Sequence, residues 1–321
     1  MKEPADARQI ARAIREHDDF LLLGHVNPDG DVVGSLLALG SAMRELGKTA
    51  RLIPGGQIPL SVSFLPGAEE LIDPQPPPSG IVVVALDCTD PGRLPDGCRD
   101  LQSAALVLNV DHHACNKLYG DLNYVDPTAV AVGELVFYIL QELGVPVDPA
   151  RAACLYAAMA TDSGMFRYEG TSPRTHRIVA ELLELGVNPR EMAERLMQTR
   201  SFEEAVLLGR ALASLRRSDD GRVAWMVLRR EDLTLDGRLH KCPEGCVDYA
   251  RDIVGVEAAA CLREREDGVR VSLRSRGTAD VNSIAAGFGG GGHARAAGCT
   301  LHQPLEQAEQ TVVRALREAV R

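Results

Sequence analysis

The segment Gly24-His25-Val26-Asn27-Pro28-Asp29-Gly30-Asp31 carries three potential metal ligands, His25, Asp29 and Asp31. The apolar run Phe20–Leu23 leads directly into it, which predicts a buried strand that ends in a tight polar turn. Three such side chains on one strand-to-helix connection point to chemistry rather than to a simple turn. A metal site that begins here needs further ligands from later parts of the chain.

The first half of the chain alternates predicted helices and strands. The pattern predicts helices at 7–17, 32–43, 131–143 and 154–161 and strands at 20–23, 50–53, 81–86 and 104–110. The last two strands are continuous apolar runs, which are typical of a parallel sheet buried on both faces. We therefore expect an N-terminal α/β domain with a parallel sheet.

Acidic and histidine side chains recur where these predicted elements end. Three strands end at His25, Asp87 and Asp111-His112-His113, and Asp162 follows the predicted helix at 154–161. In open α/β sheets, ligands bind outside the carboxyl ends of the strands. We therefore expect these side chains to converge on one crevice, although they lie far apart in the sequence.

So many carboxylates in one crevice repel one another unless cations compensate their charge. Oxygen ligands with a few imidazoles suit Mn²⁺ or Mg²⁺ better than structural Zn²⁺, which favours thiolates. Two such ions about 3.5–4 Å apart can share a carboxylate and a water, whose hydroxide can attack phosphorus. Each residue alone also has a structural explanation: Asp29-Gly30 suits a common turn, His25 a buried core position, and Asp87 a helix cap. The set as a whole favours a metal site.

The motifs resemble those of a known family. Four segments look like the four motifs of the DHH phosphoesterases: His25–Ser35, Asp87, Asp111-His112-His113 and Thr161-Asp162. Gly290–Gly298 looks like the GGGHxxAAG signature of their associated C-terminal domain. Motif order and chain length are most similar to those of the nanoRNase/pAp phosphatase subfamily, the bifunctional oligoribonucleases.

The resemblance implies two manganese ions that share Asp87, with Mg²⁺ as the alternative metal. It divides the remaining ligands between the two ions: His25 and Asp29 for the first, and Asp31, His112 and Asp162 for the second. Asp111 is expected to orient a ligand. His113 is expected to face the scissile phosphate as an electrostatic stabiliser or proton donor. Asp87, Asp111 and His113 are thus the expected catalytic residues.

A second, smaller α/β domain is predicted near the C-terminus. The pattern predicts strands at 223–228, 256–262 and 269–274 and helices at 246–253, 280–286 and 304–320. A glycine run at 289–292 interrupts this region at a helix-loop junction, and glycines let backbone N–H groups approach a phosphate closely. With the resemblance, this predicts substrate binding by Arg274, Ser275, Gly290, Gly291, Gly292, His293 and Arg295. A flexible loop and a solvated strand edge are the alternative explanations.

Between these two regions the pattern is helical. Amphipathic stretches occur at 181–186, 190–198 and 202–217. We therefore expect a DHH catalytic domain at 1–190, a helical connector at 191–218 and a C-terminal substrate-binding domain at 219–321.

Composition limits the class of partner. The net charge of −10 argues against a protein that coats long duplex nucleic acid, but a short anionic ligand held by metal ions remains compatible with it. Among the eight cysteines only Cys242 and Cys246 form a close pair, a weak zinc signal, and we expect all eight to be reduced thiols. No apolar run approaches the roughly 20 residues that span a bilayer, so we expect a cytoplasmic protein without a membrane partner.

Three functions are open at this point. The first is a two-metal phosphoesterase that hydrolyses short single-stranded RNA to mononucleotides and 3′-phosphoadenosine 5′-phosphate (pAp) to AMP. The second is a phosphodiesterase for cyclic or linear dinucleotides. The third is a nucleotide-binding regulator, which predicts that a metal ligand is missing, whereas the full set is present. We favour the first, with a homodimer as a plausible assembly.

Overall fold

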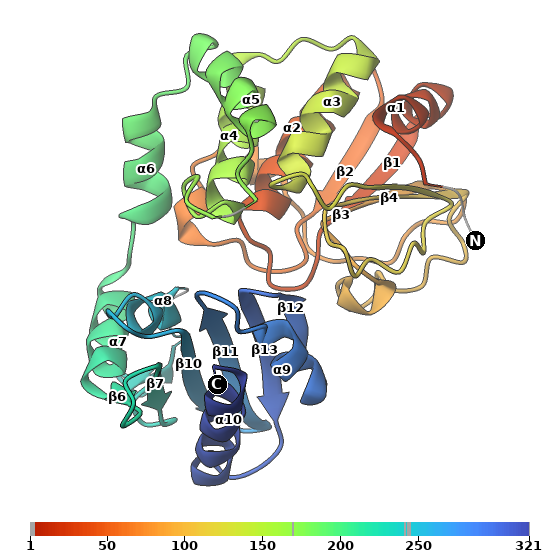
Figure 1. Ribbon diagram of the computed structural model, residues 1–321. Coiled ribbons are helices and arrows are strands. Elements are labelled where there is room, and N and C mark those ends of the chain that lie inside the picture. The colour runs from red at the N-terminus through yellow and green to blue at the C-terminus, as the bar shows by residue number, and fades with distance from the viewer. Residues whose placement is uncertain (1–3, 169, 241, 243–244, 321) are drawn as a thin grey trace. The chain divides into compact units, whose positions relative to one another are not determined.

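The chain divides after Thr199 into two units, each with its own sheet (Figure 1). The computed structural model describes residues 4–168, 170–240, 242 and 245–320. Helix α6 (Pro189–Met197) packs its buried side chains into the core of the first unit, and α7 (Phe202–Ala213) packs into a core of the second. The predicted connector, 191–218, thus contributes helix to both units.

The N-terminal unit is built on a parallel sheet with the strand order β2-β1-β3-β4-β5. Its strands are β1 (Asp19–Leu23), β2 (Thr49–Ile53), β3 (Val82–Leu86), β4 (Leu106–Asp111) and β5 (Leu122–Val125). Its other helices are α1 (Ala7–Glu16), α2 (Gly30–Glu45), α3 (Val132–Leu143), α4 (Pro149–Asp162) and α5 (Pro173–Glu184), with short 3-10 turns at Leu60–Val62, Ala68–Glu70 and Pro91–Arg93. The expected parallel α/β fold is confirmed. The sequence did not predict β5, because only one of its four residues is buried.

The central strands β1, β3 and β4 bury both of their faces. Phe20 and Leu22 of β1 pack with the core formed by the helices, whereas Leu21 and Leu23 pack with Cys88, Leu94 and Cys98 of the loop after β3. Figure 1 shows the helices gathered on one side of this sheet. The continuous apolar runs of the strands follow from this arrangement, since alternate residues point to two buried layers.

Helices α2 and α4 approach each other closely through glycines. A Cβ atom at Gly30 would lie 2.4 Å from Thr161 Oγ1, and one at Gly34 would lie 2.3 Å from the carbonyl oxygen of Cys154. Gly30 is therefore the first residue of a tightly packed helix rather than a turn residue, and Asp29 is the N-cap of that helix. The close contact brings the C-terminal end of α4 beside the start of α2.

The C-terminal unit has a mixed sheet with the order β12-β13-β11-β10-β7-β6, in which β7 and β10 are parallel. Its strands are β6 (Arg216–Arg217), β7 (Val223–Leu228), β10 (Ala258–Arg265), β11 (Gly268–Ser275), β12 (Gly291–His293) and β13 (Ala296–Leu301), and β8 (Thr234–Leu235) and β9 (Arg238–Leu239) form a separate hairpin. Its other helices are α8 (Cys246–Arg251), α9 (Val281–Gly287) and α10 (Leu305–Ala319). Helices α9 and α10 cover one face of the mixed sheet, and α7 and α8 cover the other. Within the described ranges, no helix combines the length and the apolar character that a membrane span requires.

One helix predicted for this unit is too long, and one pair of strands was not predicted. The helix predicted over 202–217 ends at Ala213, because the Ser214 hydroxyl accepts a hydrogen bond from Val227 N (3.0 Å) and Arg216–Arg217 pair with β7. The glycine run begins just after α9, whose C-cap is Phe288, and its last two residues, Gly291 and Gly292, belong to β12, which pairs with β13. Small residues with little apolar character build these strands, which is why the hydrophobic pattern did not show them.

Candidate active site

His25 and Asp87 lie at the point where the strand order of the parallel sheet changes direction, after β1 and β3. This position is the usual binding crevice of such sheets. His25 Nε2 lies 3.2 Å from Asp87 Oδ2 and 3.6 Å from Asp29 Oδ2. The backbone of Asp87 has a φ of +56°, a left-handed conformation that residues other than glycine rarely adopt. Such local strain is often found at functional sites.

Asp31 is held at the start of α3. Its Oδ2 accepts a hydrogen bond from Val132 N (2.7 Å), and its Oδ1 accepts from Gly133 N (2.9 Å) and from the Ser35 hydroxyl (3.1 Å). The side chain is almost completely buried. The sequence analysis did not predict that Val132 N and Gly133 N donate to Asp31. The one available sign was Gly133, a glycine near the start of the helix predicted over 131–143. These contacts fix the carboxylate beside the crevice.

His112 joins the crevice from the end of β4. Its Nε2 lies 3.6 Å from Asp87 Oδ1 and 3.4 Å from Asp162 Oδ2, and Asp162 is the last residue of α4. Its Nδ1 lies 3.2 Å from the carbonyl oxygen of Ala129. A proton on Nδ1 that donates to this carbonyl leaves the Nε2 lone pair directed at the carboxylates, which is the tautomer that binds metals.

Asp111 is surrounded by donors. Its Oδ1 accepts from the backbone N–H groups of His112 (2.8 Å) and His113 (3.2 Å), and it lies 2.8 Å from His113 Nδ1. Its Oδ2 accepts from Asn116 Nδ2. Asp111 thereby fixes the His113 ring, which also lies 3.3 Å from Asp87 Oδ1 through the same nitrogen.

Two groups of potential metal ligands overlap at Asp87. The ligand atoms of His25, Asp29 and Asp87 lie within 4.8 Å of one another, and so do those of Asp31, Asp87 and His112. A third such group contains Asp87, Asp111 and His113. Among the described residues, Asp87 Oδ1 is buried and has no hydrogen-bond partner. A buried carboxylate oxygen without a hydrogen-bond partner, inside a set of carboxylates and imidazoles, fits a divalent cation.

Without a cation, protons balance the charge of this cluster. Burial acts to lower the pKa of His25, but the carboxylates of Asp29 and Asp87 outweigh it and raise the pKa to about 10. Burial, reinforced by Asp87, raises the pKa of Asp31 well above its usual range. Burial also raises the pKa of Asp162 to about 7, against the effect of His112. The cluster therefore requires added positive charge, as protons or as metal ions.

The predicted substrate residues of the C-terminal unit make contacts within it. Arg274 Nε lies 3.3 Å from Asp248 Oδ1 at the end of β11. The Ser275 hydroxyl donates to the carbonyl oxygen of Ala279 (2.7 Å), and Arg295 Nη1 donates to the same oxygen (3.1 Å). Ser275 and Arg295 therefore hold the turn before α9, and their role toward substrate stays a prediction.

The glycines of this unit allow a tight hairpin. A Cβ at Gly290 would lie 2.1 Å from the carbonyl oxygen of Gly298, and one at Gly292 would lie 2.4 Å from that of Ala296. Gly291 has space around it, and His293 is exposed. Close backbone packing therefore explains Gly290 and Gly292, whereas Gly291 and His293 are accessible to a ligand.

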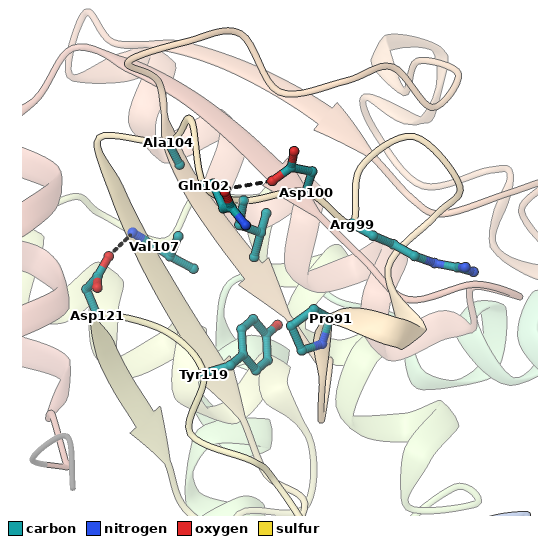
Figure 2. Close-up of a pocket in the computed structure, with 9 residues that line it drawn as sticks. Pro91, Arg99, Asp100, Gln102, Ala104, Val107, Tyr119 and Asp121 are labelled. Carbon is teal, nitrogen blue, oxygen red and sulfur yellow. Dashed lines mark hydrogen bonds between the residues drawn. The ribbon is translucent and has the colours of Figure 1, made fainter.

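A separate cavity of about 430 Å³ opens on the loop-covered face of the N-terminal sheet. It is lined by Pro91, Arg99, Asp100, Leu101, Gln102, Ala104, Val107, Tyr119 and Asp121 (Figure 2). Tyr119 connects it to the sheet, because its hydroxyl accepts a hydrogen bond from Asn109 Nδ2 (3.3 Å). None of the strand-end acids or histidines lines this cavity, so the candidate active site is the group of side chains described above. We call this group the acidic cluster: His25, Asp29, Asp31, Asp87, Asp111, His112, His113 and Asp162.

Known proteins match both units. Residues 19–159 match the DHH family, N-terminal domain, and residues 244–321 match the DHHA1 domain. A bifunctional oligoribonuclease and PAP phosphatase NrnA of Thermus thermophilus is 36% identical over 296 residues, which cover 92% of this chain and 88% of that protein. The chain belongs to the DHH family.

Further relatives agree with this assignment. A protein of the same name from Bacillus subtilis is 27% identical over 92% of this DHH chain and 93% of its own length. The crystal structure of an exopolyphosphatase-related protein from Bacteroides fragilis aligns with a TM-score of 0.86 at 25% identity, covering 97% of this chain and 95% of that one. The predicted family is confirmed. This DHH protein is a hydrolase that acts on phosphoester bonds, in a family that depends on metal ions.

Proposed function

We propose that this DHH protein uses two divalent metal ions to hydrolyse short oligoribonucleotides to nucleoside monophosphates and pAp to AMP. The main structural support is the pair of ligand groups that share Asp87 at the carboxyl ends of the strands. The names of the relatives from Thermus thermophilus and Bacillus subtilis support the substrate class.

In this proposal Asp87 would be a ligand of both ions. The other ligands are His25 and Asp29 for one ion, and Asp31, His112 and Asp162 for the other. Mn²⁺ is the proposed metal in preference to Mg²⁺, because imidazole ligands suit it better. Once bound, the ions would supply an activated water and would offset the charge that develops on the phosphate.

The remaining side chains would act through position. Asp111 would hold the His113 ring by its Nδ1, so that the ring can donate a hydrogen bond or a proton to the phosphate group. Asn116 would hold Asp111 in turn. A change at Asp111 should therefore affect His113 without removing a metal ligand.

We further propose that residues 219–321 bind the substrate, that residues 1–190 form the catalytic domain, and that residues 191–218 connect the two. Arg274 and Arg295 would supply positive charge to an anionic ligand, and Gly291 and His293 an accessible strand edge. A small binding site of this kind suits a terminal nucleotide better than a long duplex. It also allows a chain with a net charge of −10 to act on nucleic acid.

A product assay with purified protein and Mn²⁺ tests this function. The substrates are an RNA dinucleotide, a 5-mer and a 24-mer, with pAp and cyclic di-AMP as competing small substrates. We expect mononucleotides from the dinucleotide and the 5-mer, AMP from pAp, and much slower turnover of the 24-mer. Preferred turnover of cyclic di-AMP would instead make the protein a dinucleotide phosphodiesterase. Tight nucleotide binding without turnover would make it a regulator.

A further inference from the structure

Three cysteine side chains meet inside the C-terminal unit. Cys246 Sγ lies 3.3 Å from Cys242 Sγ and 3.3 Å from Cys261 Sγ, and the three sulfurs all lie within 4.8 Å of one another. All three are buried free thiols. We call Cys242, Cys246 and Cys261 the cysteine cluster.

The fold assembles this cluster from two elements. Cys246 is the first residue of α8, and Cys242 precedes it by four positions. Cys261 lies on β10, on the face that packs against α7 and α8, and the register of β10 with β7 places it opposite Met226. The sulfurs therefore meet through tertiary packing, between a helix start and a strand.

We propose that the cysteine cluster is a thiolate site for a thiophilic metal ion, with Zn²⁺ and Cu⁺ as the ions of this chemistry. Soft thiolate ligands select these ions. Cys242 and Cys246 have three residues between them, within the range that zinc ligands use. In a tetrahedral zinc site with bonds of about 2.3 Å, two sulfurs lie about 3.8 Å apart. The separations of 3.3 Å are near that value and much longer than the roughly 2.05 Å of a disulfide bond.

Arg263 places positive charge beside the cluster. Arg263 follows Cys261 by two positions on the same face of β10, and its Nε is buried without a hydrogen-bond partner among the described residues. Three thiolates around a divalent ion carry one net negative charge, which Arg263 can offset.

A metal ion here would also fix the position of α8. Asp248 of this helix lies 2.9 Å from Arg251 Nη1 and 3.3 Å from Arg274 Nε. Arg274 is a proposed substrate residue, so the ion would support substrate binding indirectly, through the position of α8. The inference itself does not depend on the proposed function, because metal content and absorption spectra do not require activity.

Metal analysis of the purified full-length protein tests this proposal. Wild type, Cys246→Ser and Cys299→Ser are expressed with added zinc and purified under reducing conditions. Cys299 is an equally buried cysteine of the same unit that lies outside the cluster, so its variant is the matched control. We expect wild type and Cys299→Ser to retain about one more equivalent of zinc per chain than Cys246→Ser. Metal bound at the acidic cluster is common to all three proteins and cancels in this difference.

Cobalt absorption gives a second readout that needs no variant. Co²⁺ added to metal-depleted wild type should produce the near-ultraviolet charge-transfer band of thiolate ligands, and either Zn²⁺ or Cu⁺ should displace it. The acidic cluster cannot produce this band, since it contains no sulfur. Equal zinc content in the three proteins, or wild type without the thiolate band, would overturn the proposal. The three cysteines would then be neutral side chains that fill the core.

Discussion

The acidic cluster of the N-terminal unit and the cysteine cluster of the C-terminal unit collect their ligands in different ways. The acidic cluster contains carboxylates that repel one another, so it must hold protons or cations even when no substrate is bound. The cysteine cluster consists of side chains that can stay neutral in an apolar core. The charge of the acidic cluster is therefore enough to indicate a bound cation. For the cysteine cluster, only the positions of the three sulfur atoms indicate one.

Substitution of Asp87 is expected to reduce activity more than any other change. The substitution Asp87→Asn removes the carboxylate shared by both groups of ligands, and we expect kcat to fall by at least about 1,000-fold, because metal-ion stabilisation contributes several kcal/mol. Steady-state hydrolysis of an RNA dinucleotide in Mn²⁺ measures it. The exposed Asp100→Asn is the control and should retain activity. The thiolate band of Co²⁺ should be unchanged in Asp87→Asn, and its loss would show that the two clusters are not independent.

A smaller effect is expected at Asp111. The substitution Asp111→Asn removes the negative charge beside His113 and turns one of the two accepting oxygens into an amide donor, but it leaves the proposed ligands in place. We expect a loss of activity of about 10–100-fold, as is usual for residues that orient a metal site. The pH profile of kcat should change as well, since the environment of His113 changes. An unchanged pH profile with full metal binding would remove Asp111 and His113 from the mechanism.

A change in the packing between α2 and α4 should weaken metal binding at the acidic cluster and leave the cysteine cluster unchanged. In Gly30→Ala, the new methyl group would meet the Thr161 side chain, and we expect a loss of stability of about 1–3 kcal/mol together with weaker Mn²⁺ binding. Thermal unfolding and Mn²⁺ titration measure these two quantities. Gly209→Ala is the control, because a Cβ on that exposed helix position meets nothing within 4 Å. Equal destabilisation by both variants would show that Gly30 has no special packing role.

The smallest expected effect is a pH dependence of the metal-free protein. The pKa of His25 is raised from 6.5 to about 10, so its proton stabilises the folded state fully below pH 6.5. This contribution is lost as the pH rises from 6.5 towards 10. We therefore expect unfolding midpoints in chelator to fall over this range, and to fall less in Mn²⁺, which takes the place of the proton. His25→Gln should reduce the fall in chelator, and an unchanged fall would exclude His25 as its source.

The two clusters also differ in how far the sequence could predict them. Each residue of the acidic cluster ends or follows a predicted element, so the parallel sheet alone brings His25, Asp87 and His112 together. Cys261 lies inside a strand, without a nearby strand or helix end to single it out, and only the register of β10 and the packing of α8 bring it to Cys242 and Cys246. The sequence also did not predict β12 and β13. These strands pair through glycine and alanine residues, which give no pattern of apolar side chains.

The central claim is that two metal ions share Asp87 at the ends of β1, β3 and β4. Anomalous diffraction from crystals of the protein grown with Mn²⁺ tests it most directly. We predict two peaks about 3.5–4 Å apart. One should lie beside His25 and Asp29, the other beside Asp31, His112 and Asp162, and both within bonding distance of Asp87. A single peak, or two peaks that do not both contact Asp87, would contradict the account.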